Sequence, residues 1–424
     1  MNNLVLYSFS SSSTSSSHTM KAIIISYFML ILGLFCSGNF GTPFDEDIGD
    51  VFNVLDYGAI SNFDIDNSQA FLEAWNAACN AETGIPKVFV PQDMTFLVYP
   101  ITFNGPCKVQ EIHFVISGTV VAPNSPSIWT GQDASLWMAF RDVIGLNVYG
   151  FGAINGQGKG WWDQSCRYHP ELALKFISCN EGRIGNINVT DSAQTHILIE
   201  GCKEFNIQNL WIQSPGNSPN TDGIHIQASQ SLSINNIKIA SGDDCISIGD
   251  YTSNIDIDNV ECGPGHGISI GSLGKGGNFV RVENIHVNNS LFIGTTNGAR
   301  IKTWQRGRGY VQQVLFENLK FINVKNPIII DQNYCDVRGA CPPQLETGVQ
   351  ISNVAYKRMT GTSGTDIAIN LNCSLSVPCS EITMHSIQLE SAIAGRQVIA
   401  SCSNAHGKET AVVPSPCLLD TSDM

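Results

Sequence analysis

The chain has 424 residues, of which 43% are hydrophobic and only 14% are charged, and it contains 39 glycines. A chain of this length and hydrophobic content can bury a large core, and many glycines with few charges favour short strands joined by tight turns over long charged helices. The formal net charge of −14 argues against nucleic acid as a partner, because binding to phosphates requires a surplus of lysine and arginine.

The first part of the chain predicts a secretory leader. Lys21 precedes an apolar run, AIIISYFMLILGLFCSG, which ends in small residues typical of a cleavage site. We therefore expect residues 1–41 to be a leader that is removed, with Met20 as a candidate true start, and residues 42–424 to form a single secreted domain. A membrane anchor is the alternative for this run, although the run is short for a bilayer span. No second apolar run of spanning length follows it.

The segment DNSQAFLEAWNAAC predicts one short amphipathic helix. Asp66 and Ser68 are suited to capping its start. Its apolar residues then follow at the i, i+4, i+7 and i+8 positions of a single helical stripe: Phe71, Trp75, Ala78 and Cys79. We expect this helix to cover the N-terminal end of the fold.

A short pattern recurs through the rest of the chain, as RIGNINV, FNIQNLWI, LSINNIKI, IDIDNVEC, VRVENIHV, VLFENLKF and VQISNVAY. One asparagine of each copy serves as a marker, and successive markers lie 23, 27, 23, 25, 34 and 35 residues apart: Asn186, Asn209, Asn236, Asn259, Asn284, Asn318 and Asn353. Such a period indicates a solenoid, and alternating polar and apolar residues with many β-branched side chains indicate short strands. About 23 residues at roughly 3.3 Å each make one coil of a parallel β-helix. We therefore predict an all-β solenoid of this kind, closed by the helix described above.

Fourteen cysteines in a secreted chain predict a disulfide framework. Removal of Cys36 with the leader leaves an odd number, so at least one thiol stays unpaired, and the sequence does not decide among Cys166, Cys179 and Cys202. Short separations favour five bridges: Cys79–Cys107, Cys245–Cys262, Cys335–Cys341, Cys373–Cys379 and Cys402–Cys417. Three glycosylation sequons, at Asn188, Asn288 and Asn372, agree with secretion. Asn188 lies in a strand-like run, which leaves open whether its side chain faces the interior.

Three acids lie within the repeats, in SPNTDGIHIQ and SGDDC. Asp222 precedes Asp244 by 22 residues, and Asp244 precedes His266 by 22 again. If a local coil has this length, these three residues stack on one face, with Asp243 beside them. Carboxylates this close cannot all ionise without cost, so at least one pKa is expected to rise and to provide a proton donor beside a base.

Two cations follow in NGARIKTW, where Arg300 and Lys302 occupy alternate positions of a predicted strand and so lie on the same side. Cations beside carboxylates suit a substrate that is itself a carboxylate. An isolated Asp-Gly pair is more often a turn, and clustered acids on a β-helix are also typical of a calcium site. The one-coil spacing with His266 argues against simple turns, and the histidine and the cations argue against calcium. We therefore expect no metal and no other cofactor.

At these residues the chain resembles a known family, the polygalacturonases of glycoside hydrolase family 28, and more closely its plant members. The resemblance extends from about Phe52 to Cys417. It rests on NTDG at residues 220–223, GDD at 242–244, GHG at 265–267 and RIK at 300–302. Each motif alone is weak evidence, but four in order, at coil-compatible spacing on a repeat of the right period, are specific.

The resemblance implies a right-handed parallel β-helix that hydrolyses α-1,4 bonds between the galacturonic acid units of pectin in the cell wall, with inversion at the anomeric carbon. Asp243 is then the general acid, Asp222 and Asp244 activate the water, and His266 orients the acid and maintains its protonation state. The substrate-binding residues implied are Asn220, Arg300, Lys302 and Tyr334. Tyr334 has packing as an alternative role. A monomer suffices for this activity, and cleavage within chains and from chain ends both stay open.

Some positions depart from the plant pattern: Ala193, Thr195, Arg306 and Arg308. The arginines predict either an extra subsite for an anionic sugar or a solvated loop, and Trp161 and Trp162 either stack on sugar or seal the core. Two other functions remain as alternatives. A β-helix pectate lyase shares the scaffold but works through calcium and an arginine base, and a catalytically silent wall protein binds pectin without cleaving it.

Overall fold

The computed structural model of the protein describes residues 50–129, 136–163, 174–336, 348–415 and 417–420. All of them belong to one compact unit that begins at Ile48. The predicted leader at residues 1–41 lies outside the described residues. Within the described residues, none of the helices has the length and apolar character that a membrane span requires.

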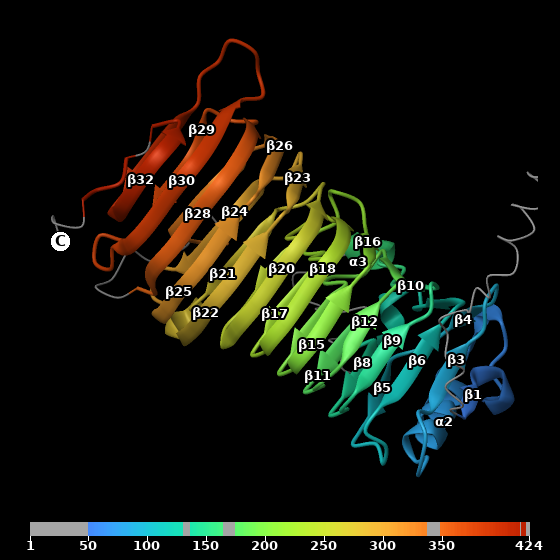
Figure 1. Cartoon of the computed structure of the whole chain (residues 1–424). Coiled ribbons are helices and arrows are strands. Elements are labelled where there is room, and N and C mark those ends of the chain that lie inside the picture. Colours follow the sequence, from blue (N-terminus) through green and yellow to red (C-terminus); the bar gives the residue numbers. More distant parts are fainter. Residues whose placement is uncertain (1–49, 130–135, 164–173, 337–347, 416, 421–424) are drawn as a thin grey trace, which may run out of the picture. The chain divides into compact units, whose positions relative to one another are not determined.

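Short parallel strands build the described residues into two extended sheets, in which every paired strand belongs to a neighbouring coil. Figure 1 shows these strands following one another in chain order, coil after coil. The sheet that we call sheet B has eleven strands: β5 (Ile101–Asn104), β8 (Met138–Arg141), β11 (Leu174–Ile177), β14 (Ile197–Glu200), β17 (Ile224–Gln227), β19 (Ile246–Ile248), β21 (Ile268–Leu273), β24 (Asn297–Trp304), β27 (Asn326–Tyr334), β29 (Ile367–Asn372) and β31 (Ile399–Ser403).

The other strands form sheet A, which bends so that most coils contribute two strands or one long bent strand to it. Its members are β1 (Val51–Asn53), β2 (Asn62–Asp66), β3 (Lys87–Val90), β4 (Thr95–Leu97), β6 (Ile112–Ile116), β7 (Thr119–Val121), β9 (Leu146–Tyr149), β10 (Ala153–Asn155), β12 (Arg183–Gly185), β13 (Asn188–Thr190), β15 (Lys203–Gln208), β16 (Trp211–Gln213), β18 (Gln230–Ala240), β20 (Thr252–Cys262), β22 (Phe279–Asn288), β23 (Leu291–Ile293), β25 (Arg308–Glu317), β26 (Lys320–Val324), β28 (Gln350–Ser363), β30 (Cys379–Ser391) and β32 (Ala405–Val413).

The chain therefore forms the predicted right-handed parallel β-helix, the hand that parallel crossovers adopt almost without exception. Coil length follows from the strand register. Ile224 pairs with Ile246 and Ile246 with Ile268, so two successive coils have 22 residues each. The next coil is longer, because Ile268 pairs with Ala299. The predicted coil length is thus correct in the middle of the chain, and later coils expand.

The marker asparagines lie at bends of sheet A. All seven have positive φ values between 52° and 56°, a left-handed conformation that asparagine adopts more readily than most residues. Asn186, Asn209, Asn236 and Asn259 form a ladder in which each amide donates to the oxygen of the preceding one, with distances from 2.5 to 3.2 Å. The seven markers do not form one column. Asn284 donates to Asn254 at 2.7 Å and belongs to a second bend of the coil.

The predicted capping helix is α2 (Ser68–Cys79), and its four predicted stripe residues are all buried. The Asp66 carboxylate accepts from the backbone N–H of Ser68 at 2.9 Å, as expected for a residue near the helix start. Trp75 packs on Phe103 and Phe140, with ring centroids 5.4 and 5.5 Å apart, and these rings continue a stack of aromatic side chains inside the coils. The described chain also contains α3 (Lys159–Trp162) and three 3-10 helices, η1 (Val54–Tyr57), η2 (Pro126–Trp129) and η4 (Lys275–Gly277).

Four of the five predicted disulfides are present: Cys79–Cys107, Cys245–Cys262, Cys373–Cys379 and Cys402–Cys417. Cys335 is also disulfide-bonded, but its predicted partner Cys341 lies outside the described residues. Cys179 and Cys202 are buried free thiols. Cys166 lies outside the described residues.

Candidate active site

A cleft of about 680 Å³ lies over sheet B, where the turns that precede β17, β19 and β21 meet strands β24 and β27. All eight site residues predicted from the sequence line this cleft: Asn220, Asp222, Asp243, Asp244, His266, Arg300, Lys302 and Tyr334. The sequence motifs therefore converge on one place although they span more than a hundred residues of chain.

Register places the stacked residues as predicted. Asp222, Asp244 and His266 each lie two positions before a strand of sheet B, and the strands pair at Ile224, Ile246 and Ile268. Backbone bonds join the same turns. Gly223 N–H donates to the carbonyl of Asp244 at 2.9 Å, and His266 N–H donates to the carbonyl of Asp243 at 2.7 Å. The ladder of the solenoid thus fixes the separation of the acidic side chains.

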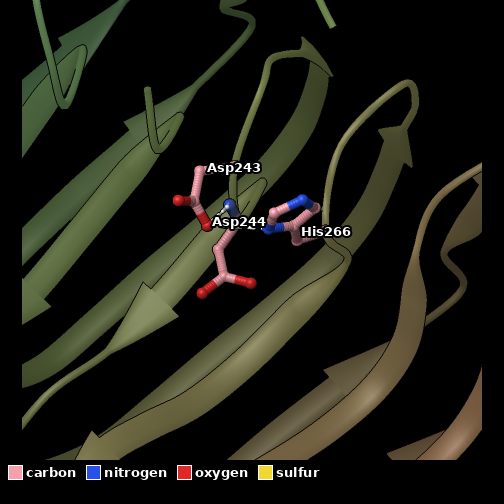
Figure 2. A group of neighbouring side chains, drawn as sticks. All are labelled: Asp243, Asp244 and His266. Carbon is pink, nitrogen blue, oxygen red and sulfur yellow. Dashed lines mark hydrogen bonds and ion pairs between the residues drawn. The ribbon is translucent and has the colours of Figure 1, made fainter. Parts of the chain in front are cut away.

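Asp243 lies beside His266. The imidazole Nδ1 is 2.9 Å from the Asp243 Oδ1, and the same oxygen accepts from the backbone N–H of Asp244 at 2.8 Å. Figure 2 shows Asp243 and His266 on the turns before neighbouring strands, with the carboxylates of Asp243 and Asp244 pointing in different directions. Burial would raise the pKa of Asp243, but the hydrogen bond and charge of His266, together with Lys302, outweigh it and lower that pKa.

Asp244 is only 1% exposed and is held by three side chains. The Lys302 ammonium donates to its Oδ2 at 2.8 Å, the Ser269 hydroxyl donates to its Oδ1 at 2.7 Å, and Arg300 Nη1 lies 3.8 Å from Oδ1. Burial would lower the pKa of Lys302, but the Asp244 carboxylate outweighs it and raises that pKa. Lys302 therefore stays a cation in a nearly buried position.

Asp222 contacts a different set of groups. The Ser247 hydroxyl donates to its Oδ2 at 2.5 Å, and His225 Nδ1 lies 2.7 Å from the same hydroxyl. Burial raises the pKa of Asp222 well above its ordinary value, and the negative charges of Asp243 and Asp244 raise it further. Of the Asp222 and Asp243 carboxyls, that of Asp222 therefore holds its proton more tightly in the free site.

This distribution bears on the expectation that crowding raises the pKa of one carboxyl. A pKa does rise, as expected, but it is that of Asp222 and not that of Asp243, the residue to which the family resemblance gives the role of acid. The reason is local. His266 provides a hydrogen bond to Asp243, whereas Asp222 has only the Ser247 hydroxyl and the distant charge of Lys302 to stabilise its ionised form.

Arg300 and Lys302 on β24 and Tyr334 on β27 line the cleft beside the acids. Tyr334, at the end of β27, has its ring 5.6 Å from the Arg300 guanidinium and 5.4 Å from the Lys302 ammonium, and packs edge-on against Trp304 at 5.5 Å. Tyr334 is partly exposed and lines the cleft, so it packs against the two cations and is also accessible from the cleft. Asn220 lies in the turn before Asp222, with a positive φ of 54°.

Several residues in or beneath the cleft were not predicted. His225, Ser247 and Ser269 occupy one register column that continues to Arg300 on the next coil. The sequence carries a signal for this column, because GIHI, CISI and GISI are variants of one motif, but the sequence alone does not distinguish His225 from an ordinary strand residue. His196 was also missed. It is buried beneath the cleft, its Nδ1 lies 2.9 Å from the Asp222 carbonyl, and burial lowers its pKa to about 4.

The positions that depart from the plant pattern contribute little to the cleft. Arg306 and Arg308 are exposed and do not line it, and Arg308 Nε donates to the Gly277 carbonyl, which favours the solvated-loop interpretation. Ala193 is buried, whereas Thr195 lines an adjoining depression of about 440 Å³ that shares Asn220 and Asp222 with the cleft. Trp161 is buried in the core, as its packing interpretation required.

Among the described residues, one group has ligand atoms close enough to share a metal ion: Asp243, Asp244 and His266, within 4.8 Å of one another. The same atoms already have protein partners. His266 Nδ1 bonds Asp243, and the Asp244 carboxylate bonds Lys302 and Ser269. A cation at this place would compete for these side chains with their protein partners.

Known proteins resemble this chain in sequence and in fold. A protein of Arabidopsis thaliana named as a probable polygalacturonase is 41% identical over 378 residues, covering 87% of this chain and 84% of its own. Polygalacturonase-2 of Solanum lycopersicum is 41% identical over 374 residues, with 87% and 80% covered. The crystal structure of an endo-xylogalacturonan hydrolase from Aspergillus tubingensis shares the fold, with a TM-score of 0.73, 19% identity, and 85% and 98% covered. Residues 79–413 match the family described as Glycosyl hydrolases family 28. The chain belongs to that family.

Proposed function

We propose that the protein is a polygalacturonase, which hydrolyses the α-1,4 bonds between galacturonic acid units of pectin. The observation that carries the proposal is the cleft in which Asp222, Asp243 and Asp244 lie beside Arg300 and Lys302. Carboxylates supply proton transfer at a glycosidic bond, and cations bind the carboxylate of a uronic acid. The relatives named as polygalacturonases support the same substrate class.

In the proposed reaction Asp243 donates its proton to the oxygen of the scissile bond as that bond to the anomeric carbon breaks. Water attacks the anomeric carbon from the opposite face, and its proton passes to Asp222 or Asp244, which inverts the configuration. Asp244 is oriented as an acceptor by Lys302 and Ser269. His266 contacts Asp243 and positions it, while Arg300, Lys302, Tyr334 and Asn220 bind the sugar.

The proton must lie on Asp243 when the substrate is bound, although His266 lowers the pKa of Asp243 in the free site. The carboxyls titrate as a group, so the proton distribution changes with the surroundings. A bound galacturonate adds a negative charge beside Arg300 and Lys302 and displaces water from the cleft. Both changes raise the pKa of Asp243 and favour its protonated form. We expect the optimum on the acidic side of neutrality.

We also propose the biological setting that the sequence suggests. Residues 1–41 act as a secretory leader, and residues 42–424 work in the cell wall as a monomer with pectic polysaccharide as partner and without nucleic acid. The charge of −14 argues against a nucleic-acid partner, and it leaves the binding of an anionic sugar to the local cations of the cleft.

The test is digestion of demethylated polygalacturonan in the presence of EDTA, with wild type beside Asp243→Asn. We expect new reducing ends from wild type alone, and the product lengths then distinguish internal cleavage from release of monomers. Products with unsaturated ends, formed only without EDTA, would identify a calcium-dependent lyase instead. Binding of the polymer by folded wild type without new reducing ends would identify a silent pectin-binding protein.

A further inference from the structure

A hollow of about 650 Å³ lies on sheet A, away from the cleft residues, over strands β4, β7, β10 and β13. One register column crosses it, in which Thr119 pairs with Ala153 and Ala153 with Asn188. Thr119 and Ala153 have short side chains, and the neighbouring residues Gly118 and Gly152 have none. The surface is therefore hollowed because small residues follow one another from coil to coil.

Asn188 borders this hollow and faces outward. In β13, Val189 points into the core and is fully buried, so the side chains on either side of it, Asn188 and Thr190, lie on the outer face. This settles the orientation that the sequence left open. Asn188 and Thr190 form a glycosylation sequon, N-V-T, and among the described residues the side-chain amide of Asn188 makes no hydrogen bond.

Two aromatic side chains border the same site without packing against the core. Phe151 lines the hollow, is 79% exposed, and has a positive φ of 64°, a conformation that a bulky residue rarely adopts. Trp211 pairs with Asn188 on the next coil and is 53% exposed. Exposed aromatic rings beside a polar attachment point are suited to stacking on the apolar faces of sugar rings.

In the other two sequons the asparagine side chain already makes hydrogen bonds. The Asn288 oxygen accepts from Asn318 at 2.7 Å within the ladder of sheet A. Asn372 donates to Asp331 at 3.1 Å and accepts from Asn333 at 3.0 Å. Neither asparagine lines the hollow. Asn188 is thus the sequon for which the folded structure offers both an unengaged amide and space beside it.

We infer that Asn188 carries an N-linked glycan whose inner N-acetylglucosamine units lie in this hollow against Phe151 and Trp211. The inference rests on the secretory route proposed above, because the donor is a lipid-diphosphate-linked oligosaccharide of that route. The bond between the first sugar and the diphosphate breaks, a bond from that sugar carbon to Asn188 Nδ2 forms, and Nδ2 loses one proton as the lipid diphosphate leaves. The glycan covers apolar surface that the fold leaves exposed.

The experiment uses five full-length proteins secreted from a eukaryotic host: wild type, Thr190→Ala, Phe151→Ala, the double variant and Thr190→Ser. Thr190→Ser is the matched control, because it retains the sequon. Peptide mass mapping is expected to find a glycan on Asn188 in wild type, Phe151→Ala and Thr190→Ser, and none where Thr190 is alanine. Phe151→Ala is expected to lower the Tm by several degrees in the glycosylated protein and to leave it nearly unchanged in the Thr190→Ala background.

An unmodified Asn188 peptide from secreted wild type would overturn the inference. An equal effect of Phe151→Ala in both backgrounds would overturn the packing of the glycan on the ring. If Thr190→Ala is not secreted, enzymatic removal of the glycan from wild type and from Phe151→Ala provides the same comparison. None of these readouts measures pectin hydrolysis, so the failure of this inference and the failure of the proposed function remain distinguishable.

Discussion

The Nζ of Lys302 lies 2.8 Å from the Oδ2 of Asp244, although 58 residues separate the two in the chain. The side chain of Lys302 is 10% exposed and that of Asp244 is 2% exposed. The ammonium group belongs to the strand that is two coils beyond the turn of Asp244. Removing one partner from such a pair leaves a buried charge without compensation, which costs more than the pair itself contributes.

Lys302→Met is therefore expected to destabilise the protein by about 3–5 kcal/mol as well as to abolish hydrolysis. Asp244→Asn combined with Lys302→Met removes both charges and is expected to recover most of the lost stability without recovering activity. Thermal unfolding of the wild type, both single variants and the double variant measures the difference. A double variant as unstable as Lys302→Met would contradict the account of the pair.

Asp243→Asn is expected to lower kcat/KM on polygalacturonan by about 10²–10⁴-fold, the usual contribution of general acid catalysis. With a galacturonide whose aryl leaving group needs no proton, the same variant should lose far less. Asp222→Asn is expected to be impaired on both substrates, because the attacking water is activated in both cases. If Asp222→Asn instead recovered activity on the aryl galacturonide and Asp243→Asn did not, the general acid would be Asp222, whose pKa is raised in the free site.

His266→Gln is expected to shift the pH profile. His266 lowers the pKa of Asp243, so its removal lets that pKa rise. The acid is active when it is protonated, and a higher pKa keeps it protonated to higher pH. The alkaline limb of kcat/KM should therefore move to higher pH while the maximal rate falls. If the alkaline limb of kcat/KM did not move, its pKa would belong to a group other than Asp243.

Asp222→Asn is expected to raise the Tm at pH 7 by a few degrees. The folded pKa of Asp222 is raised above its unfolded value, so the wild type loses stability as the pH rises from the unfolded pKa through the folded one. The amide resembles the protonated form and does not titrate. The gain should shrink as the pH falls through the unfolded pKa of about 3.9 and vanish well below it, where both states of the wild type are protonated. A gain that is constant with pH would point to another cause.

The Cys245–Cys262 disulfide begins at the residue after Asp244 and links the catalytic turn to the end of β20. Its loop of 17 residues predicts a stabilisation of about 3 kcal/mol. Replacing both cysteines by alanine is expected to lower the Tm accordingly and to reduce kcat more than KM, because the acids shift while the cations on β24 remain. Replacing Cys402 and Cys417 is the control, which should lower the Tm and leave kcat unchanged.

The parts of the fold that follow from local periodicity were predictable. The spacing of 22 residues placed Asp222, Asp244 and His266 in one column, and the strand alternation placed Arg300 and Lys302 on one face. The marker asparagines correctly indicated a solenoid but do not share one bend. Each coil has two bends with left-handed residues, and Asn284 belongs to the second bend, whereas Asn318 lies at the same bend as Asn259. A single-sequence pattern does not distinguish two bends with the same residue preference.

The electrostatics of the cleft followed less directly from the sequence. Proximity of three acids predicts that some pKa rises, but which one depends on hydrogen bonds from Ser247, Ser269 and His266. Ser247 lies 25 residues beyond Asp222, and Ser269 lies 25 beyond Asp244. This repeated offset was present in the sequence, but only the coil register gives it meaning.

The register of sheet B also limits how the gene for this protein can change in length. The coil from β21 to β24 is longer than 22 residues, because Ile268 pairs with Ala299, yet Arg300 still pairs with Ser269 and lies in the column of Ser247 and Ser269. One residue gained or lost within β24 would instead turn Arg300 and Lys302 towards the core and Ile301 towards the solvent. Extra residues are therefore tolerated in the turns and in the bulges of β21 and β27, whereas β24 keeps the regular alternation that orients Arg300 and Lys302.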